Sequence, residues 1–144
     1  MNRDFESISE AKQSIIDEFS LFDEWVDRYE YIIELGKSLD GLPKEFHIEQ
    51  FRVKGCQSQV WFKPETVEKK IIYNADSDAM IVRGLIALLL RVYSGRTPDE
   101  ILNTPPDFFE TIELGSHLSG SRANGLHAMV NYIQSYALSQ KEKL

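Results

Sequence analysis

The hydrophobic positions of this 144-residue chain change period twice, from helical spacing to alternation and back to helical spacing. The first stretch predicts an amphipathic helix over residues 8–20, because apolar side chains recur there every three or four positions: Ile8, Ala11, Ile15, Ile16 and Phe19. Ser7 and Glu10 flank its start at the spacing of a capping box. We therefore expect a capped N-terminal helix.

A second helical run follows, and its apolar and aromatic side chains share one face: Trp25, Val26, Tyr29, Ile32 and Ile33. Glycine and proline end helices, so this run should stop near Gly36 or at the segment Asp40-Gly41-Leu42-Pro43.

Alternation of polar and apolar residues replaces the helical period from Ile48 onward. Residues 50–54, 59–62 and, more weakly, 70–73 show it, and we expect each segment to be a strand. With joins at residues 55–58 and about 64–68, the three strands would form an antiparallel meander. Its buried face should carry the apolar and aromatic side chains Phe51, Val53, Val60, Phe62 and Tyr73.

The chain then returns to helical spacing. Ser77 or Asp76 should cap a helix that has Asp78 in its first turn and runs to about Tyr93, where Ser94-Gly95 ends it. Gly84 inside this helix indicates close packing against a neighbour.

Two proline-containing segments predict shorter helices. Thr97-Pro98-Asp99-Glu100 combines proline at the first helical position with a capping box, and Thr104-Pro105-Pro106-Asp107 should open another helix. The last helix follows the loop HLSGS and has one apolar face, formed by Leu126, Met129, Val130, Ile133 and Ala137.

Helices on both sides of a small three-stranded antiparallel sheet predict an α+β fold. The chain shows no internal repeat, linker or low-complexity segment, so we expect a single domain over residues 1–144. Apolar residues make up 42% of the chain and charged residues 27%, which is typical of a globular protein.

Charge and hydropathy narrow the functional classes. The net charge of −7 argues against nucleic-acid binding, which needs clustered Lys and Arg. The most apolar stretch, AMIVRGLIALLLRVY, is shorter than the roughly 20 residues that cross a bilayer and contains Arg83 and Arg91, so we expect a buried helix and no membrane span. The N-terminal sequence lacks the apolar centre of a signal peptide. With the free thiol described next, this predicts a reducing, cytoplasmic location.

Cys56, in the segment VKGCQSQVW, is the only cysteine, and it should lie at the tip of the first predicted hairpin. Gly55 can adopt a positive φ and sharpen that turn. Two interpretations stay open from the local sequence: a small buried side chain, as many lone cysteines are, or a functional thiol in a turn. A functional thiol reacts as the thiolate. Lys54 is the nearest cation in sequence, and Arg122 would act if the fold brings it close.

The three histidines, His47, His117 and His127, are dispersed. With one thiol they do not make a four-ligand zinc site, so we expect no metal. Asp76-Ser77-Asp78 lacks the glycine and distal glutamate of a calcium loop, and helix capping accounts for it. His117 can act as a base for Cys56 in a hydrolase, or it can cap a helix or pack in a loop.

Ser119-Gly120-Ser121-Arg122 precedes the final helix. The segment has two interpretations: an anion-binding loop with free backbone N–H groups, or a helix cap made by Ser121.

Four segments occur in the order RYEYIIELGKSL, VKGCQSQVW, ADSDAMIVRGLIALLL and SHLSGSRANGLHAMV. Together they resemble the SufE family, the sulfur-acceptor proteins of iron–sulfur cluster assembly. The best-matching region covers about residues 23–138, which leaves the predicted helix 8–20 as an appended element of open role. The resemblance implies a SufE/IscU-like α+β fold.

The cysteine of the GCQS loop in that family accepts a sulfane sulfur from a cysteine desulfurase, forms a persulfide and passes the sulfur to a scaffold. The resemblance implies this role for Cys56, with Arg122, Asp78 and His117 as supporting residues. It implies a SufS-like desulfurase and a SufBCD-like scaffold complex as partners, and leaves a homodimer open. No cofactor is expected, because pyridoxal phosphate belongs to the desulfurase, which this chain would activate without being an enzyme on its own.

Gly120 departs from the family pattern, which usually has proline in an HLTPSR-like stretch. A lone thiol suits sulfur transfer, because exchange at sulfur needs one attacking thiolate. The alternative is a cysteine hydrolase or transferase that uses Cys56 with His117. A cluster scaffold is less favoured, because one cysteine supplies too few thiolates for an iron–sulfur cluster.

Overall fold

A computed structural model describes residues 6–143 of the chain. Its elements, in chain order, are α1 Ile8–Ser20, α2 Trp25–Ser38, the 3₁₀ turns η2 Lys44–Phe46 and η3 Glu49–Phe51, β1 Val60–Val67, β2 Lys70–Ser77, α3 Met80–Tyr93, α4 Pro98–Leu102, α5 Phe108–Thr111, α6 Leu114–His117 and α7 Gly120–Lys143. The α+β class is confirmed.

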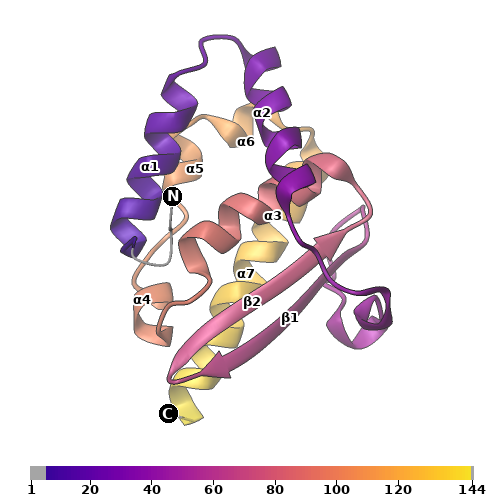
Figure 1. Cartoon of the computed structure of the whole chain (residues 1–144), viewed down its shortest axis with the longest axis vertical. Helices are drawn as coiled ribbons and strands as arrows, with labels where there is room; N and C mark the ends of the chain where they lie inside the picture. The colour runs from indigo at the N-terminus through magenta and orange to yellow at the C-terminus, as the bar shows by residue number, and fades with distance from the viewer. Residues whose placement is uncertain (1–5, 144) are drawn as a thin grey trace.

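Helix α3 lies in the middle of the molecule (Figure 1). Helices α1 and α2 pack on one side of it, the β1–β2 hairpin lies on another, and α7 runs behind the hairpin. Most side chains of α3 are buried, as the apolar stretch predicted: Val82, Leu85, Ile86, Leu88, Leu89, Val92 and Tyr93. Among residues 6–143, no helix is long and apolar enough to cross a membrane.

Two glycines allow α2 and α3 to approach closely. A Cβ on Gly84 would collide with the carbonyl oxygen of Ile32, and a Cβ on Gly36 would lie 2.5 Å from the carbonyl oxygen of Met80. Both contacts are with backbone, which cannot rotate away as a side chain can. The close packing predicted at Gly84 is confirmed.

Both predicted capping boxes are present. The hydroxyl of Ser7 accepts a hydrogen bond from the N–H of Glu10 at 3.0 Å, and the Glu10 carboxylate accepts from the N–H of Ser7 at 3.1 Å. Thr97 and Glu100 repeat the arrangement at the start of α4, where Pro98 is the first helical residue. These local signals needed no tertiary information to be read correctly.

The sheet has two antiparallel strands among the described residues, so the predicted three-stranded meander is not confirmed. The segment predicted as the first strand starts instead as η3, and only Arg52 pairs, through a single bridge to Trp61. Four side chains predicted to line the buried face are indeed buried: Val53, Val60, Phe62 and Tyr73. The fifth, Phe51, is half-buried on η3.

Pro64 limits how far a further strand could extend along the free edge of β1. The N–H groups of Ile71 and Tyr73 on β2 point away from β1, toward Arg96 and Ser94. Tyr73 pairs with Pro64 in the register, so the nitrogen of Pro64 also faces outward. Proline has no N–H to offer there, so a strand extended from Arg52 along this edge would lack a donor.

Pro64 therefore does not interrupt β1, and the predicted join at residues 64–68 is wrong. The turn is shorter, because Val67 pairs directly with Lys70. Its two central residues, Glu68 and Lys69, both have positive φ, 52° and 69°, as a type I′ hairpin turn requires. Neither residue is the glycine or asparagine that signals such a turn in a sequence.

The starts of α3 and α7 differ from the predicted caps. Ala79 is the N-cap of α3, and its methyl side chain can make no cap bond; Ser77 and Asp76, the predicted caps, make other contacts. At α7 the capping hydroxyl belongs to Ser119, which accepts from the N–H of Arg122 at 3.3 Å. The prediction that Ser121 caps this helix is wrong.

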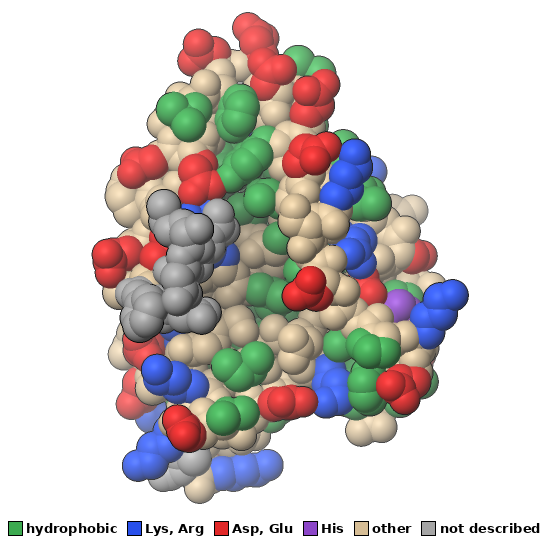
Figure 2. All heavy atoms as spheres, in the orientation of Figure 1, with side chains coloured by type: hydrophobic (Ala, Val, Ile, Leu, Met, Phe, Trp, Pro, Cys, Tyr) green, Lys and Arg blue, Asp and Glu red, His purple; other side chains and the backbone are tan. Residues whose placement is uncertain are grey.

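A groove of about 740 Å³ opens between α2, α3 and β2, and Figure 2 shows the hollow with apolar side chains at its floor. Two arginines in its wall are already bonded. Arg91 pairs with Glu18 at 2.8 Å, and Arg96 donates to the carbonyl oxygens of Val92 and Glu6. The groove shares no lining residue with the cysteine pocket described next.

Candidate functional site

Cys56 lies in a loop between η3 and β1 that is closed at its base. Arg52 pairs with Trp61, and the N–H of Val53 donates to the carbonyl oxygen of Val60 at 2.8 Å. Gly55 has φ +93°, so the positive φ predicted from the sequence is confirmed. Cys56 lies in a loop, as predicted, but a single bridge closes this loop where the prediction had a hairpin of two paired strands.

The loop rests on two small residues of α7. A Cβ on Gly55 would lie 3.2 Å from the Cβ of Ala128, and the Sγ atom of Cys56 lies 3.6 Å from the carbonyl oxygen of Gly125. The absence of larger side chains at these positions of α7 lets the loop backbone come this close to the helix.

The downstream end of the loop is fixed by the last residue of β2 and the residue that follows it. The Asp78 carboxylate accepts a hydrogen bond from the N–H of Gln59 at 3.0 Å. The hydroxyl of Ser77 donates to the carbonyl oxygen of Gln59 at 2.7 Å. Asp78 thus holds the loop that carries the cysteine, a different task from the helix capping expected of it.

The thiol of Cys56 is half-buried and donates its hydrogen bond to the carbonyl oxygen of Gly125. Burial raises the pKa of the thiol, because an apolar environment disfavours the thiolate, and the positive charge of Arg52 opposes this effect. The resting form is therefore the neutral thiol.

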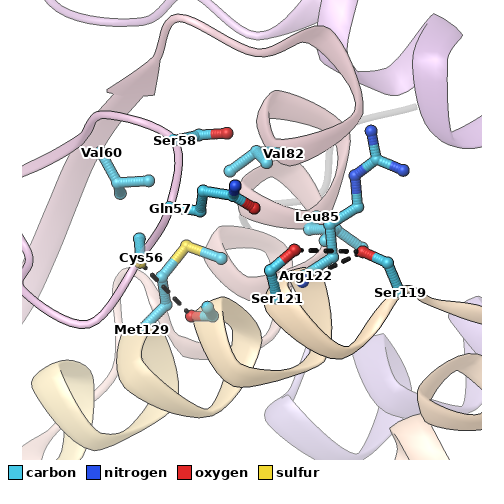
Figure 3. A pocket seen from close by; sticks show the side chains of 11 residues that line it. Cys56, Gln57, Ser58, Val60, Val82, Leu85, Ser119, Ser121, Arg122 and Met129 are labelled. Carbon is cyan, nitrogen blue, oxygen red and sulfur yellow. Dashed lines mark hydrogen bonds between the residues drawn. The ribbon is translucent and has the colours of Figure 1, made fainter.

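A cavity of about 230 Å³ opens beside the sulfur (Figure 3). Side chains from three distant parts of the chain build its apolar wall: Val60 from β1, Val82 and Leu85 from α3, and Met129 from α7. Its polar rim consists of Gln57, Ser58, Ser119, Ser121 and Arg122. The cavity thus offers apolar surface beside the thiol and hydrogen-bonding groups at its mouth.

Arg122 lines this cavity, so the fold brings it to the cysteine loop as expected. Its guanidinium, however, points away from the thiol in Figure 3. The side chain is exposed, and its backbone N–H is bonded to Ser119. In this arrangement Arg122 is available to a partner at the rim and does not neutralise the sulfur directly.

His117 is not among the residues that line the cavity. Its ring stacks on Trp25 with the ring centroids 3.9 Å apart, and its carbonyl oxygen accepts a hydrogen bond from the hydroxyl of Tyr29. A Cys56–His117 pair, which a cysteine hydrolase would need, finds no support in this geometry. His117 instead packs α6 against α2.

Sequence reasoning missed the buried carboxylate of Asp76. Asp76 accepts hydrogen bonds from the N–H groups of Leu42 and Ser77 and from His47, and forms an ion pair with Arg83. Burial raises the pKa of Asp76, but these hydrogen bonds and the Arg83 charge outweigh it and leave the pKa below its usual value. Two aspartates two residues apart look alike in a sequence, so no local signal marked this one as buried.

Arg52 was also missed as a group that acts on the cysteine. Lys54, the nearest cation in sequence, is exposed, and neither Lys54 nor Arg52 lines the cavity. No group of three His, Cys, Asp or Glu side chains in residues 6–143 is arranged to hold a metal ion.

Comparison with known proteins gives consistent matches. The sequence model of a family described as "SufE: Fe-S metabolism associated domain" matches residues 13–137. A SufE-like protein of Rhizobium meliloti is 43% identical over 128 residues, which cover 85% of this chain and 91% of that protein. A SufE-like protein of Synechocystis is 37% identical over 125 residues, covering 87% of this chain and 79% of that one.

A plant protein and a solved structure extend the comparison. The chloroplastic/mitochondrial SufE-like protein 1 of Arabidopsis thaliana is 37% identical over 139 residues, which cover 96% of this chain and 38% of the plant protein. The solution structure of a hypothetical protein from Thermus thermophilus superposes with a TM-score of 0.73 at 20% identity, covering 90% of this chain and 94% of that one. This last match supports the fold alone.

Proposed function

Because the chain belongs to the SufE family, whose domain is associated with iron–sulfur metabolism, we propose that it is a sulfur acceptor and that Cys56 is its accepting residue. The donor would be a SufS-like, pyridoxal-phosphate-dependent cysteine desulfurase, and the recipient a SufBCD-like scaffold complex. The observation that carries the proposal is the cavity that opens beside the only thiol of the chain.

The proposed transfer is an exchange at sulfur. The thiolate of Cys56 attacks the outer sulfur of a persulfide on the desulfurase. The S–S bond of the donor breaks, its cysteine leaves as a thiolate, and a new S–S bond joins the outer sulfur to Cys56. One sulfur atom moves with no net oxidation, and no further cysteine or external oxidant is needed.

The cavity suits the product of this step. A persulfide is easily oxidised and easily attacked by other thiols, so a carrier must limit the access of solvent to it. Val60, Val82, Leu85 and Met129 supply a largely apolar wall within a space of about 230 Å³. A sulfur atom added to Cys56 would extend into this space without displacing the loop.

The residues around the cavity agree with a carrier that has no cofactor of its own. No lysine lines the cavity, and a lysine is what a pyridoxal phosphate enzyme uses to hold its cofactor as a Schiff base. The desulfurase would therefore supply that chemistry, and this chain would act as its activator in the cytoplasm.

The rate of alanine formation by the desulfurase tests the proposal. Removal of the sulfur by an acceptor should free the desulfurase for its next turnover, so wild-type protein should raise the rate. The Cys56→Ser variant should bind without raising it, and its thermal unfolding should match the wild type, because a half-buried loop residue contributes little packing. Equal stimulation by the serine variant would refute the role of Cys56.

A further inference from the structure

Trp61 lies where the closure of the cysteine loop meets the wall of its cavity. Its backbone pairs with Arg52 and closes the loop. The preceding residue, Val60, lines the cavity, and its carbonyl oxygen accepts the N–H of Val53 at 2.8 Å. Successive side chains of a strand point to opposite faces, so the indole ring of Trp61 points away from the cavity. A contact that holds this ring therefore helps to hold both the loop closure and one wall of the cavity.

The ring of His47 lies flat on the indole ring of Trp61. The ring centroids are 4.1 Å apart, and the two planes are inclined by only 6°. Trp61 is buried on this face of β1. The backbone of His47 is anchored separately, because its N–H donates to the carbonyl oxygen of Lys44 at the end of η2, at 3.0 Å. The stack therefore connects Trp61 to a segment outside the loop.

Hydrogen bonds set the orientation of the His47 ring. Its Nε2 atom lies 3.0 Å from the carbonyl oxygen of Leu42 and 3.0 Å from a carboxylate oxygen of Asp76. Both oxygens are acceptors, so Nε2 carries a hydrogen and donates it. Asp76 is the cross-strand partner of Trp61, and directly opposed side chains share one face of a sheet. His47 thus contacts both members of one cross-strand pair.

His47 does not line the cavity, so its ring does not touch the thiol of Cys56. The hydrogen on Nε2 faces two acceptors, which leaves no role as a base at that atom. Any effect of His47 on the thiol therefore passes through Trp61 and the closure of the loop.

We propose that His47 is a positioning residue for sulfur transfer: its ring holds Trp61 in place, and this stack limits how often the cysteine loop opens at its base. The use of such a contact in sulfur transfer rests on the proposed function. The contact itself is a property of the isolated protein and can be tested there.

The test is the rate of Cys56 alkylation by iodoacetamide at fixed pH, followed by intact mass with no desulfurase present. His47→Ala should make alkylation faster by roughly threefold to tenfold, the size expected for the loss of one aromatic stack. His47→Phe keeps a flat ring on Trp61 without the hydrogen bonds, and should react nearly as slowly as the wild type. His47→Gln keeps an N–H for Asp76 without the ring, and should react as fast as the alanine variant.

The phenylalanine and glutamine variants separate this role from a general effect on stability. A protein of ordinary stability is unfolded for less than about one part in a thousand of the time, so little alkylation passes through the unfolded chain. Urea unfolding gives the unfolded fraction of each variant in the assay buffer, and the rate that passes through it is subtracted. The remaining rates should depend on the presence of a ring at position 47.

His117→Ala is the matched control. It removes a second stack of the same kind, in which the ring centroids of His117 and Trp25 are 3.9 Å apart. Neither residue lines the cavity, so the alkylation rate should stay at the wild-type value. A wild-type rate in His47→Ala or His47→Gln, a fast rate in His47→Phe, or equal acceleration in His117→Ala would overturn the proposal.

Failure here is distinguishable from failure of the proposed function. The alkylation rate reports on access to the thiol in the isolated protein, whereas sulfur acceptance is measured with the desulfurase. If the rates do not change as stated and Cys56 still accepts sulfur, then His47 is excluded as a positioning residue and the sulfur-acceptor role stands.

Discussion

At the scale of single residues, the site consists of the sulfur atom of Cys56 and of neighbouring groups that hold its loop in place without reacting. Cys56 is kept against α7 by its contact with the carbonyl oxygen of Gly125. The two ends of its loop are joined by the pairing of Arg52 with Trp61, and the downstream end is also held by the hydrogen bond from Gln59 to Asp78. A carrier must both shelter a sulfur and deliver it. The loop therefore needs attachments that are specific but individually weak, and single hydrogen bonds such as those to Gly125 and Asp78 meet that need.

Asp78→Ala should make Cys56 more accessible. The change removes the acceptor of the Gln59 N–H at one end of the loop, so the loop should open more often. We expect alkylation of Cys56 to become faster by roughly threefold to tenfold at fixed pH, which corresponds to about 1 kcal/mol of lost tethering. Stopped alkylation followed by mass spectrometry measures the rate.

Asp99→Ala is the control for that experiment. Asp99 is an exposed carboxylate that pairs with Lys141, and it lines no part of the cysteine cavity. Its alkylation rate should equal that of the wild type. If Asp78→Ala also reacts at the wild-type rate, Asp78 does not hold the loop.

At the scale of elements, the packing of α2 on α3 depends on two glycines. Gly84→Ala should destabilise the protein by about 1–3 kcal/mol, because its Cβ would meet the backbone of Ile32 and force the helices apart. Gly115→Ala, on α6, adds the same methyl group with no neighbour within 4 Å and should be nearly neutral. Urea unfolding of both variants measures the difference, and equal stabilities would show that the α2–α3 contact tolerates a methyl group.

Gly120, where the family usually has proline, lies at the start of α7. Gly120 is the first residue of the helix, does not have a positive φ, and has open space where a side chain would begin. Proline is favoured at this position, since its fixed φ suits the first turn and no intrahelical bond needs its N–H. Gly120→Pro should therefore raise the free energy of unfolding by about 0.4–1 kcal/mol.

The same variant should leave the cavity beside Cys56 unchanged, because Gly120 does not line it. Thermal unfolding and the alkylation rate of Cys56 together check both statements. A loss of stability would mean that the backbone at Gly120 is incompatible with proline.

The helices and the cysteine loop could be predicted because their signals are local. Capping boxes at Ser7 and Thr97, and the positive φ of Gly55, each depend on a few consecutive residues. The first predicted strand, residues 50–54, did not form, because a strand depends on pairing with a distant edge as well as on local alternation, and only Arg52 pairs there, with Trp61.

The residues of the site could likewise be predicted only where their signals are local. Cys56 and Arg122 were found from their motifs and do lie around one cavity. The apolar wall could not be assigned, since Val60, Val82 and Met129 look like ordinary core residues until the fold brings them together. Asp76 acts through contacts with Leu42, His47 and Arg83, which are distant in sequence or hidden by the fold, so no spacing distinguished it from a solvated charge.

At the scale of the whole molecule, Asp76 connects three parts of the chain that are distant in sequence. It joins the segment after α2, through Leu42 and His47, to the end of β2 and to Arg83 on α3. His47 in turn stacks on Trp61, the residue that pairs with Arg52 at the base of the cysteine loop. The site is thereby attached to the core.

Asp76→Asn should destabilise the protein by about 3 kcal/mol at pH 7, because it leaves the Arg83 charge without its partner. The pKa of Asp76 is lower in the folded protein than in the unfolded chain, so its contribution is complete above about pH 4 and is lost as the pH falls through the folded value. The difference between wild type and variant should therefore shrink in acid.

Urea unfolding at pH 7 and pH 3 measures this difference, with the exposed Asp40→Asn as a control that should match the wild type at both. A difference between wild type and Asp76→Asn that is as large at pH 3 as at pH 7 would show that the charge of Asp76 is not what stabilises the fold.

The most direct test of the central claim is the intact mass of the protein after incubation with a SufS-like desulfurase, pyridoxal phosphate and cysteine. The wild-type chain should gain about 32 Da for one sulfur atom on Cys56, and a reductant should remove it. The Cys56→Ser variant, and wild-type protein alkylated beforehand, should gain nothing. An adduct of the same mass on the serine variant would contradict the account, as would an unmodified wild-type protein beside a desulfurase that is turning over.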